Sequence, residues 1–158
     1  MGKAISHQTQ VPLHAAQMDD PHAALGVAVR LFLDDPKFAR LTFGHWASTL
    51  LGQINRGHYR FILNGNEVVG FLGWCFADEV HAEAWVAGAD LTFDLSQAGD
   101  CMIINAWVAR SAIVNRFVLN EARMIGKHKK WIFFKRYYAD GRVRPMKLSV
   151  NKYAGSHG

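Results

Sequence analysis

Two polar residues are the first candidates for chemistry in this chain. His45 lies near the predicted start of a helix, where the helix dipole disfavours the imidazolium and so favours a neutral base. A capping or solvent-exposed histidine is the alternative interpretation. Asn105 interrupts the apolar run Met102–Ala109, and a buried amide there must find hydrogen-bond partners. Asn105 can orient a catalytic histidine or bind a substrate arm, and a purely structural hydrogen bond is equally open.

The remaining chemistry-bearing residues give weaker signals. His58 follows a glycine at a predicted turn, so we expect a structural or exposed role. His81 and Glu83 form a pair that lacks a third ligand, which is a weak indication of a metal site, and we predict none. Cys75 and Cys101 both lie in apolar runs, which favours two packed, reduced thiols over a disulfide or a metal site.

Length and composition predict one folded domain. The chain has 158 residues, of which 50% are hydrophobic and 20% charged, so it can bury a core and does not have the composition of a disordered chain. We predict a flexible arm over residues 1–18, the folded domain over 19–153 and a disordered tail over 154–158. No segment approaches the roughly 20 apolar residues that span a bilayer. Residues 1–10 lack the apolar core of a secretory signal.

Capping residues and hydrophobic periodicity predict the elements. Asp20-Pro21 and Asp35-Pro36 are helix starts, because Asp caps a helix and Pro fits its first position. Two predicted helices begin at Pro21 and Pro36. Three more cover residues 46–54, 79–86 and 111–125. The predicted strands cover 59–63, 68–76, 89–94, 102–109, 131–138 and 142–150. This order predicts an α/β (α+β) fold with one mixed sheet and helices packed on both faces.

Charge is unevenly distributed along the sequence. Residues 127–158 contain nine Lys or Arg and one acid, whereas residues 1–126 contain nine Lys or Arg and twelve acids. Such asymmetry indicates that the C-terminal part faces an acidic partner, and nucleic acid, a membrane surface or an acidic protein all fit. A merely solvated basic face is the alternative.

A set of spacings is more specific than the element order. Leu25-Gly26, Pro36 ten residues later, the segment 54–59 and Gly73-Trp74 form one ungapped frame, and Gly99-Asp100 and Trp107-Val108-Ala109 follow it. The chain, over about residues 22–115, thereby resembles the toxin-activating lysine acyltransferases. The resemblance implies a divergent acetyltransferase-like (GNAT-type) fold, a cytoplasmic location and a homodimer. It also implies transfer of a fatty acyl group from acyl carrier protein to lysine side chains of a protoxin.

The resemblance also identifies two catalytic positions, and this sequence departs from the family at both. The family pattern has a His two residues after its proline and an Asp directly before its tryptophan, where this chain has Phe38 and Ala106. Neither can accept or donate a proton. His45 lies two helical turns after Phe38 and shares its face if one helix runs through both. Asn105 precedes Ala106, and on a regular strand the two point to opposite faces.

The donor can be argued from a missing motif. Acetyl-CoA enzymes of the implied fold cradle the diphosphate with a glycine-rich turn at a helix start, but residues 108–113 contain no glycine. We therefore expect no permanently bound cofactor and a donor carried as a phosphopantetheine thioester on acyl carrier protein. We expect the basic residues and one hydroxyl of this region to bind this acidic donor: Arg110, Ser111, Arg116, Arg123, Lys127, Lys129 and Lys130.

Three functions stay open. The first is an active acyltransferase whose acceptor is a protoxin lysine or a small ribosomal peptide. The second is a catalytically inactive family member that acts as a binding or regulatory partner. The third is a nucleic-acid surface on the hairpin 129–147, where aromatic and basic residues interleave as stacking platforms require. Alternating strands give that mixture by default, which makes nucleic acid the least favoured partner.

Overall fold

The computed structural model describes residues 12–92, 96 and 98–150. In these residues the helices are α1 (Pro21–Leu33), α2 (Pro36–Ala39), α3 (Phe43–Arg56), α4 (Glu79–Val86) and α5 (Ala112–Ile125). The strands are β1 (Leu13–Ala16), β2 (Tyr59–Asn64), β3 (Glu67–Ala77), β4 (Cys101–Ala109), β5 (Trp131–Tyr137) and β6 (Val143–Ser149). Among the described residues, no helix is long and apolar enough to cross a membrane.

The capping and stop residues predicted from the sequence are found at the ends of the helices. The Asp20 side chain accepts hydrogen bonds from the backbone N–H groups of His22 and Ala23 at the start of α1. Asp35 accepts one from the backbone N–H of Lys37 at the start of α2. Gly57 ends α3 in the left-handed conformation with φ of 70°, which glycine adopts without steric cost.

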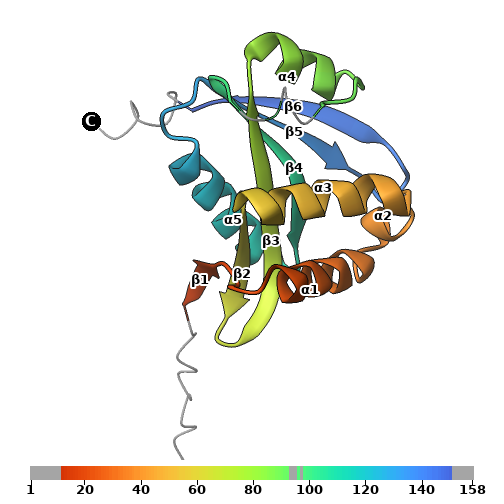
Figure 1. The fold of residues 1–158 in the computed structure, drawn as a ribbon, viewed down its shortest axis with the longest axis vertical. Coiled ribbons are helices and arrows are strands. Elements are labelled where there is room, and N and C mark those ends of the chain that lie inside the picture. Colours follow the sequence, from red (N-terminus) through yellow and green to blue (C-terminus); the bar gives the residue numbers. More distant parts are fainter. Residues whose placement is uncertain (1–11, 93–95, 97, 151–158) are drawn as a thin grey trace, which may run out of the picture.

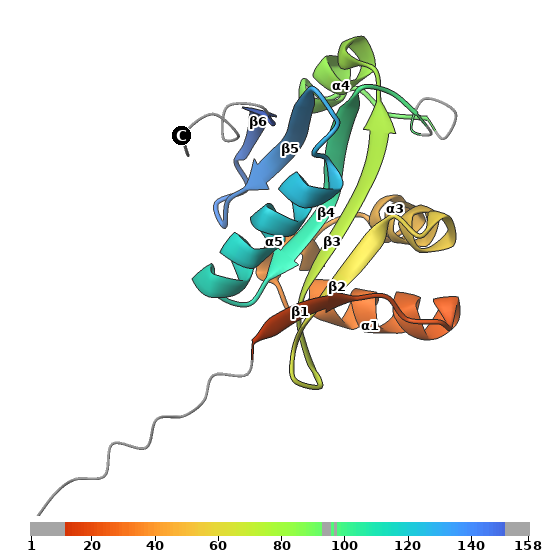
Figure 2. The same ribbon diagram turned by 90° about the vertical axis from the view of Figure 1, so that its left-hand side faces the viewer.

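The strands form one mixed sheet in the order β1-β2-β3-β4-β5-β6. Neighbouring strands are antiparallel except β4 and β5, which run parallel (Figure 1). The parallel pair is joined by α5, as a crossover connection requires. Helices cover both faces, with α5 on one side and α1 and α3 on the other (Figure 2). The predicted α/β class with a single mixed sheet is confirmed.

Strand β4 contains a bulge at Asn105. Ile104 pairs with Trp74 of β3 and Ala106 pairs with Gly73, so Asn105 is one extra residue in β4. The bulge changes which residues share a face: Ile104 and Trp107 both pack on the α5 side, although they are three residues apart. Ala106 packs on the opposite side, under α1 and α3.

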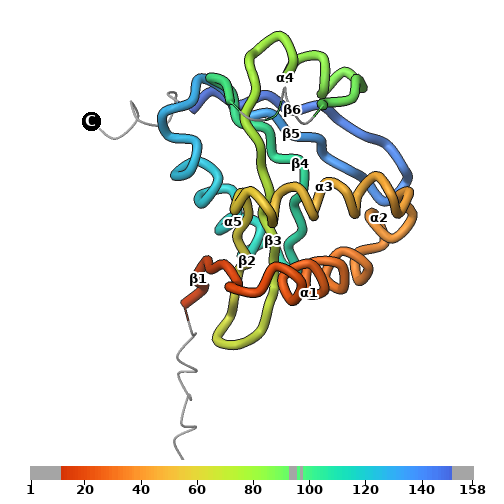
Figure 3. Tube along the Cα trace, viewed as in Figure 1, coloured from red at the N-terminus to blue at the C-terminus, as the bar shows by residue number. Residues whose placement is uncertain are grey.

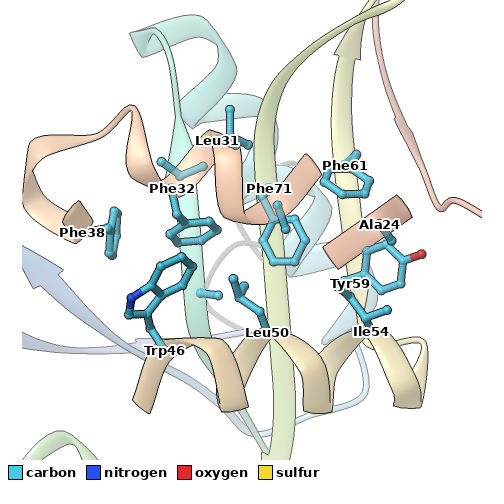
Figure 4. Packing of buried hydrophobic residues seen from close by; sticks show 13 residues of the cluster. Ala24, Leu31, Phe32, Phe38, Trp46, Leu50, Ile54, Tyr59, Phe61 and Phe71 are labelled. Atoms are coloured by element: carbon cyan, nitrogen blue, oxygen red, sulfur yellow. The ribbon is translucent and has the colours of Figure 1, made fainter. Parts of the chain in front are cut away.

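Aromatic residues fill the space between the sheet and the helices α1 and α3. The Phe32 ring of α1 contacts the rings of both Phe38 and Trp46, with centroids 4.9 Å and 6.3 Å away (Figure 4). Phe71 of β3 packs edge-on against Phe32 at 5.6 Å. The chain path in Figure 3 shows how α1, α2 and α3 follow one another across this face. Burial of these rings fixes α2, which has only four residues, against the sheet.

Two predicted features are corrected. Residues 13–16 were expected in a flexible arm but form β1, which pairs antiparallel with β2. The short segment has no strong periodicity, and its pairing depends on a neighbour more than 40 residues away, which local sequence does not report. Residues 89–92 of the strand predicted over 89–94 are not in a strand, and 93–94 lie outside the described residues. Residues 1–11 and 151–158, including the predicted tail, also lie outside them.

Substitution of Gly99 tests the close packing just before the start of β4. It has φ of 153°, and a Cβ on it would lie 2.0 Å from the backbone carbonyl carbon of Ala77. We expect Gly99→Ala to lower the free energy of unfolding by about 2–4 kcal/mol, measured by urea denaturation followed by circular dichroism. Gly26→Ala is the matched control, since a Cβ there has no neighbour within 4 Å and lies in helix α1. Equal effects of the two substitutions would contradict this packing.

Candidate active site

A cavity of about 470 Å³ opens where β4 and β5 separate. Pairing between these strands covers Cys101 to Ile104 and Trp131 to Phe134, and no further pairs join them. The residues that follow on each strand, 105–109 and 135–137, therefore line opposite walls of the gap. The lining residues are Lys37, Phe38, Trp85, Ile104, Asn105, Ala106, Trp107, Val108, Ala109, Ser111, Ala112, Asn115, Leu119, Phe134, Lys135, Arg136, Tyr137 and Met146.

One end of the cavity is the N-terminus of α5. Ser111 caps this helix, and its Oγ accepts a hydrogen bond from the backbone N–H of Val114 at 3.2 Å. Asn115, one turn later, also lines the cavity. The first backbone N–H groups of a helix have no partner within it and favour negative charge or hydrogen-bond acceptors. This end is therefore suited to the polar arm of a ligand.

The opposite side of the sheet supplies aromatic rings and two lysines. Trp85 from α4 and Tyr137 from β5 line the cavity together with Lys37 and Lys135. Burial raises the pKa of the Tyr137 hydroxyl and lowers the pKa of the Lys135 ammonium. Tyr137 therefore keeps its proton at neutral pH and is available as a hydrogen-bond donor.

Both positions at which the resemblance predicts a His and an Asp line this cavity. Phe38 and Ala106 both line it, and they are only 8% and 5% exposed. The Phe38 ring packs edge-on against Tyr137 with centroids 5.6 Å apart. Both side chains belong to the buried core cluster under α1 and α3, and neither carries an ionisable group.

Asn105 lies in the cavity wall, and its partner comes from α3. Gln53, which is fully buried, donates a hydrogen bond through Nε2 to Oδ1 of Asn105. The Gln53 side chain packs against Gly73, where any Cβ would overlap it. Because Asn105 points toward α3, it shares a face with Ala106. The expectation of opposite faces is wrong, since the bulge breaks the strand alternation.

His45 lies apart from this site. It is exposed in the first turn of α3 and is not among the cavity residues. No single helix runs through Phe38 and His45, since α2 ends at Ala39 and α3 begins at Phe43, so the condition for a shared face is not met. The neighbouring Trp46 takes the buried position of this turn. The structure does not bring His45 and Asn105 together, and the catalytic role of His45 stays a prediction.

The four predicted donor-binding residues between Arg110 and Arg123 occupy different environments. Ser111 lines the cavity. Arg110 is bound to Asp34 at 3.1 Å and Glu67 at 3.3 Å, which joins β4 to α1 and β3. Arg116 is exposed and Arg123 half-buried on α5, outside the cavity lining.

The other candidates have structural surroundings. His58 stacks on Trp74 with centroids 5.8 Å apart, and burial, with the charges of Arg56 and Arg60, lowers its pKa. His81 Nδ1 lies 2.7 Å from the Asp78 carboxylate at the start of α4. Cys75 and Cys101 are free and buried, and burial raises their pKa to about 12 and about 11.

Sequence reasoning missed several cavity residues. Lys135 and Tyr137 follow the aromatic run of β5 and were assigned only to a basic hairpin. Their alternation with Phe133 was a usable signal, because it places both on one face of β5. Lys37 and Trp85 gave no comparable signal, since they reach the cavity from α2 and α4 by tertiary packing.

The Gln53–Asn105 pair can be measured by a double-mutant cycle. We expect Asn105→Ala to lower the free energy of unfolding by about 1–3 kcal/mol, because the buried Gln53 amide loses its acceptor. Asn105→Ala and Gln53→Ala together should cost less than the sum of the single substitutions by about 1 kcal/mol. Urea denaturation of the four proteins measures this. Additive effects would contradict a direct hydrogen bond.

Comparison with known proteins agrees with this geometry. The model of the RTX toxin acyltransferase family (HlyC) matches residues 17–151. No curated protein sequence matches the chain. A solved structure described as a GNAT-like decarboxylase, GphF, in complex with isobutyryl-CoA is similar with a TM-score of 0.50 and 15% identity, over 78% of this chain and 65% of that one. The chain therefore spans less than two thirds of that structure's length.

A second structure, of histone acetyltransferase HPA2 and related acetyltransferase from Corynebacterium glutamicum, has a TM-score of 0.43 and 18% identity, over 78% of this chain and 75% of that one. The likeness to the GphF structure supports a GNAT-like fold, which agrees with the parallel β4–β5 pair at the cavity. The match of the family model over most of the sequence shows that this chain belongs to the RTX toxin acyltransferase family.

Proposed function

We propose that this chain transfers a fatty acyl group from acyl carrier protein to a lysine or similar amine side chain of a protein or peptide acceptor, such as a protoxin. The observation that carries the proposal is the cavity between β4 and β5. It begins at the N-terminus of α5 and reaches Phe38 and Ala106, the two positions that match the family's catalytic residues. A cytoplasmic location and a homodimer, which the family resemblance implies, stay predictions.

The cavity suits a thioester donor. Its α5 end offers helix backbone N–H groups and the Ser111 and Asn115 side chains to the polar pantetheine arm. The divergent strands beyond Ile104 and Phe134 leave backbone groups that a linear arm can pair with. Aromatic and apolar walls then receive the acyl chain.

Without the family's His and Asp, catalysis must rest mainly on positioning. The acceptor amine attacks the thioester carbonyl, an oxyanion forms, and the pantetheine thiolate leaves. Tyr137 keeps its proton and can donate a hydrogen bond to the oxyanion or to the leaving sulfur. Asn105, held by Gln53, can orient the donor. Holding two reactants in place contributes a large share of many enzymatic rate accelerations.

Catalytic inactivity is the second candidate function, and one observation favours it. Phe38 and Ala106 are packed in the core, and the Phe38 ring contacts Phe32 and Tyr137. These two positions therefore present no ionisable side chain to the cavity. A protein of this kind would bind acyl-loaded carrier protein or the acceptor without transfer.

A transfer assay separates the two candidates. We expect co-expression with the acceptor and acyl carrier protein to add a fatty acyl mass to the acceptor, measured as intact mass. Ala109→Trp should abolish the increment, because it fills the cavity next to α5. Ala139→Trp, in the exposed turn between β5 and β6, is the matched control and should leave transfer unchanged. Donor binding by wild type without any increment would establish the inactive function.

The same assay tests His45. Loss of the increment in His45→Ala, with folding retained, would support its role as the base. An increment that survives would remove His45 from the mechanism.

The carrier-protein surface is predicted along the outer face of α5. Arg116 of α5 and Lys127, two residues after the end of α5, are exposed, and Ile113 is 64% exposed near the cavity. Carrier proteins are acidic, so we expect Arg116→Glu combined with Lys127→Glu to weaken donor binding at least about tenfold at low salt, with a smaller effect at high salt. Calorimetry with octanoyl-loaded acyl carrier protein measures this. Arg30→Glu on α1, across the sheet, is the control. Donor binding that changes neither with these charge reversals nor with salt would contradict a carrier-protein surface on α5.

A further inference from the structure

Lys135 occupies a special position in the cavity. The last pair between β4 and β5 is Ile104 with Phe134. Lys135 is the next residue of β5, and Asn105 is the next residue of β4. Strand alternation places Lys135 on the same face as Phe133, on the side covered by α4. Its Nζ lies 4.3 Å from the centroid of the Trp85 ring of α4. The amine is thus held at the point where the two strands begin to separate.

Lys135 differs from Lys147 and Lys37 in its partners. Among the described residues, no carboxylate lies within ion-pair distance of its Nζ. Lys147 on the neighbouring β6 has the same 4.3 Å spacing to a tryptophan ring, Trp131, but Glu79 and Glu83 bind it as an ion pair. Lys37, which also lines the cavity, lies 3.6 Å from Asp35.

The surroundings of Lys135 and Lys147 shift the pKa values of the two amines in opposite directions. Burial lowers the pKa of Lys135, against a smaller contribution from the Asp90 charge. The hydrogen bonds that the Lys147 ammonium donates to Glu83 and Glu79 raise the pKa of Lys147. A lysine is a nucleophile only as the neutral amine, so Lys135 is the better prepared of the two.

We propose that Lys135 is itself an acyl acceptor, and that the chain attaches to it the acyl group of a thioester bound between β4 and β5. This inference rests on the proposed function, because it uses the same donor cavity. It adds a modification site within the chain, with a fatty acyl thioester as the substrate class.

The step is a balanced acyl transfer. The Nζ lone pair attacks the thioester carbonyl carbon, and a C–N bond forms while the carbonyl oxygen becomes an oxyanion. The oxyanion then collapses, the C–S bond breaks, and the pantetheine sulfur leaves and takes up the proton that the amine loses. The products are an amide on Lys135 and a free carrier thiol. The attached chain would occupy the cavity, so a modified molecule should bind further donor less well.

The test needs no external acceptor. The purified full chain is incubated with octanoyl-loaded acyl carrier protein, and its intact mass and proteolytic peptides are measured over time. We expect one octanoyl group on Lys135, added at least about tenfold faster than to Lys37 or Lys147. Lys135→Arg should remove this increment and Lys147→Arg should not. The preference for Lys135 should disappear in urea-unfolded protein.

The outcomes are distinct. Acylation spread evenly over the lysines, or unchanged in folded Lys135→Arg, would overturn the inference. If the donor binds, or passes its acyl group to an added protein, while wild-type Lys135 stays unmodified, the inference fails and the proposed function stands. If octanoyl carrier protein neither binds nor loses its acyl group, both fail. Peptide mapping of the wild type keeps the result decisive even if a variant does not fold.

Discussion

The separation of β4 from β5 is the constraint on which the site depends. The two strands pair over only four residues each, and the bulge at Asn105 follows directly. A bulge increases the local twist and bends its strand, which helps the two strands diverge. Gly73 and Gln53 support it from the other side, because only a residue without Cβ leaves room for the Gln53 amide that binds Asn105. The cavity therefore follows from the pairing pattern of the sheet.

Aromatic packing determines the surroundings of Phe38, the position at which the resemblance predicts a histidine. Phe38 enters the core formed with Phe32 and Trp46, and it fixes the short helix α2 against the sheet. A histidine at this position would have to be hydrated or hydrogen-bonded, whereas the phenyl ring gains from burial. Compared with the histidine of the family pattern, Phe38 cannot carry a proton, but its ring makes buried apolar contacts. The groups left at the cavity that can exchange protons or accept an acyl group are Lys37, Ser111, Lys135 and Tyr137, joined by the always-charged Arg136.

Much of the fold could be predicted from sequence, and less of the site. The helix starts at Asp20 and Asp35 and the stop at Gly57 depend on local chemistry, which sequence records directly. The strand β1 and the faces of Asn105 and Ala106 depend on pairing between distant segments, which it does not record. The cavity residues come from α2, α4, β4, α5 and β5, so Lys135 and Trp85 meet only in the folded chain. His45 was attractive for its place in a helix, but α3 turns that position outward.

We propose that the donor thioester binds between β4 and β5. Titration of the ¹⁵N-labelled chain with octanoyl-loaded acyl carrier protein tests this binding site, because tryptophan indole N–H signals are resolved probes. Trp85 and Trp107 line the cavity, and Trp74 lies away from it in the core of the sheet. We expect the Trp85 and Trp107 signals to shift with octanoyl-loaded carrier protein and to shift much less with unloaded carrier protein. Unchanged Trp85 and Trp107 signals in a donor complex would contradict it.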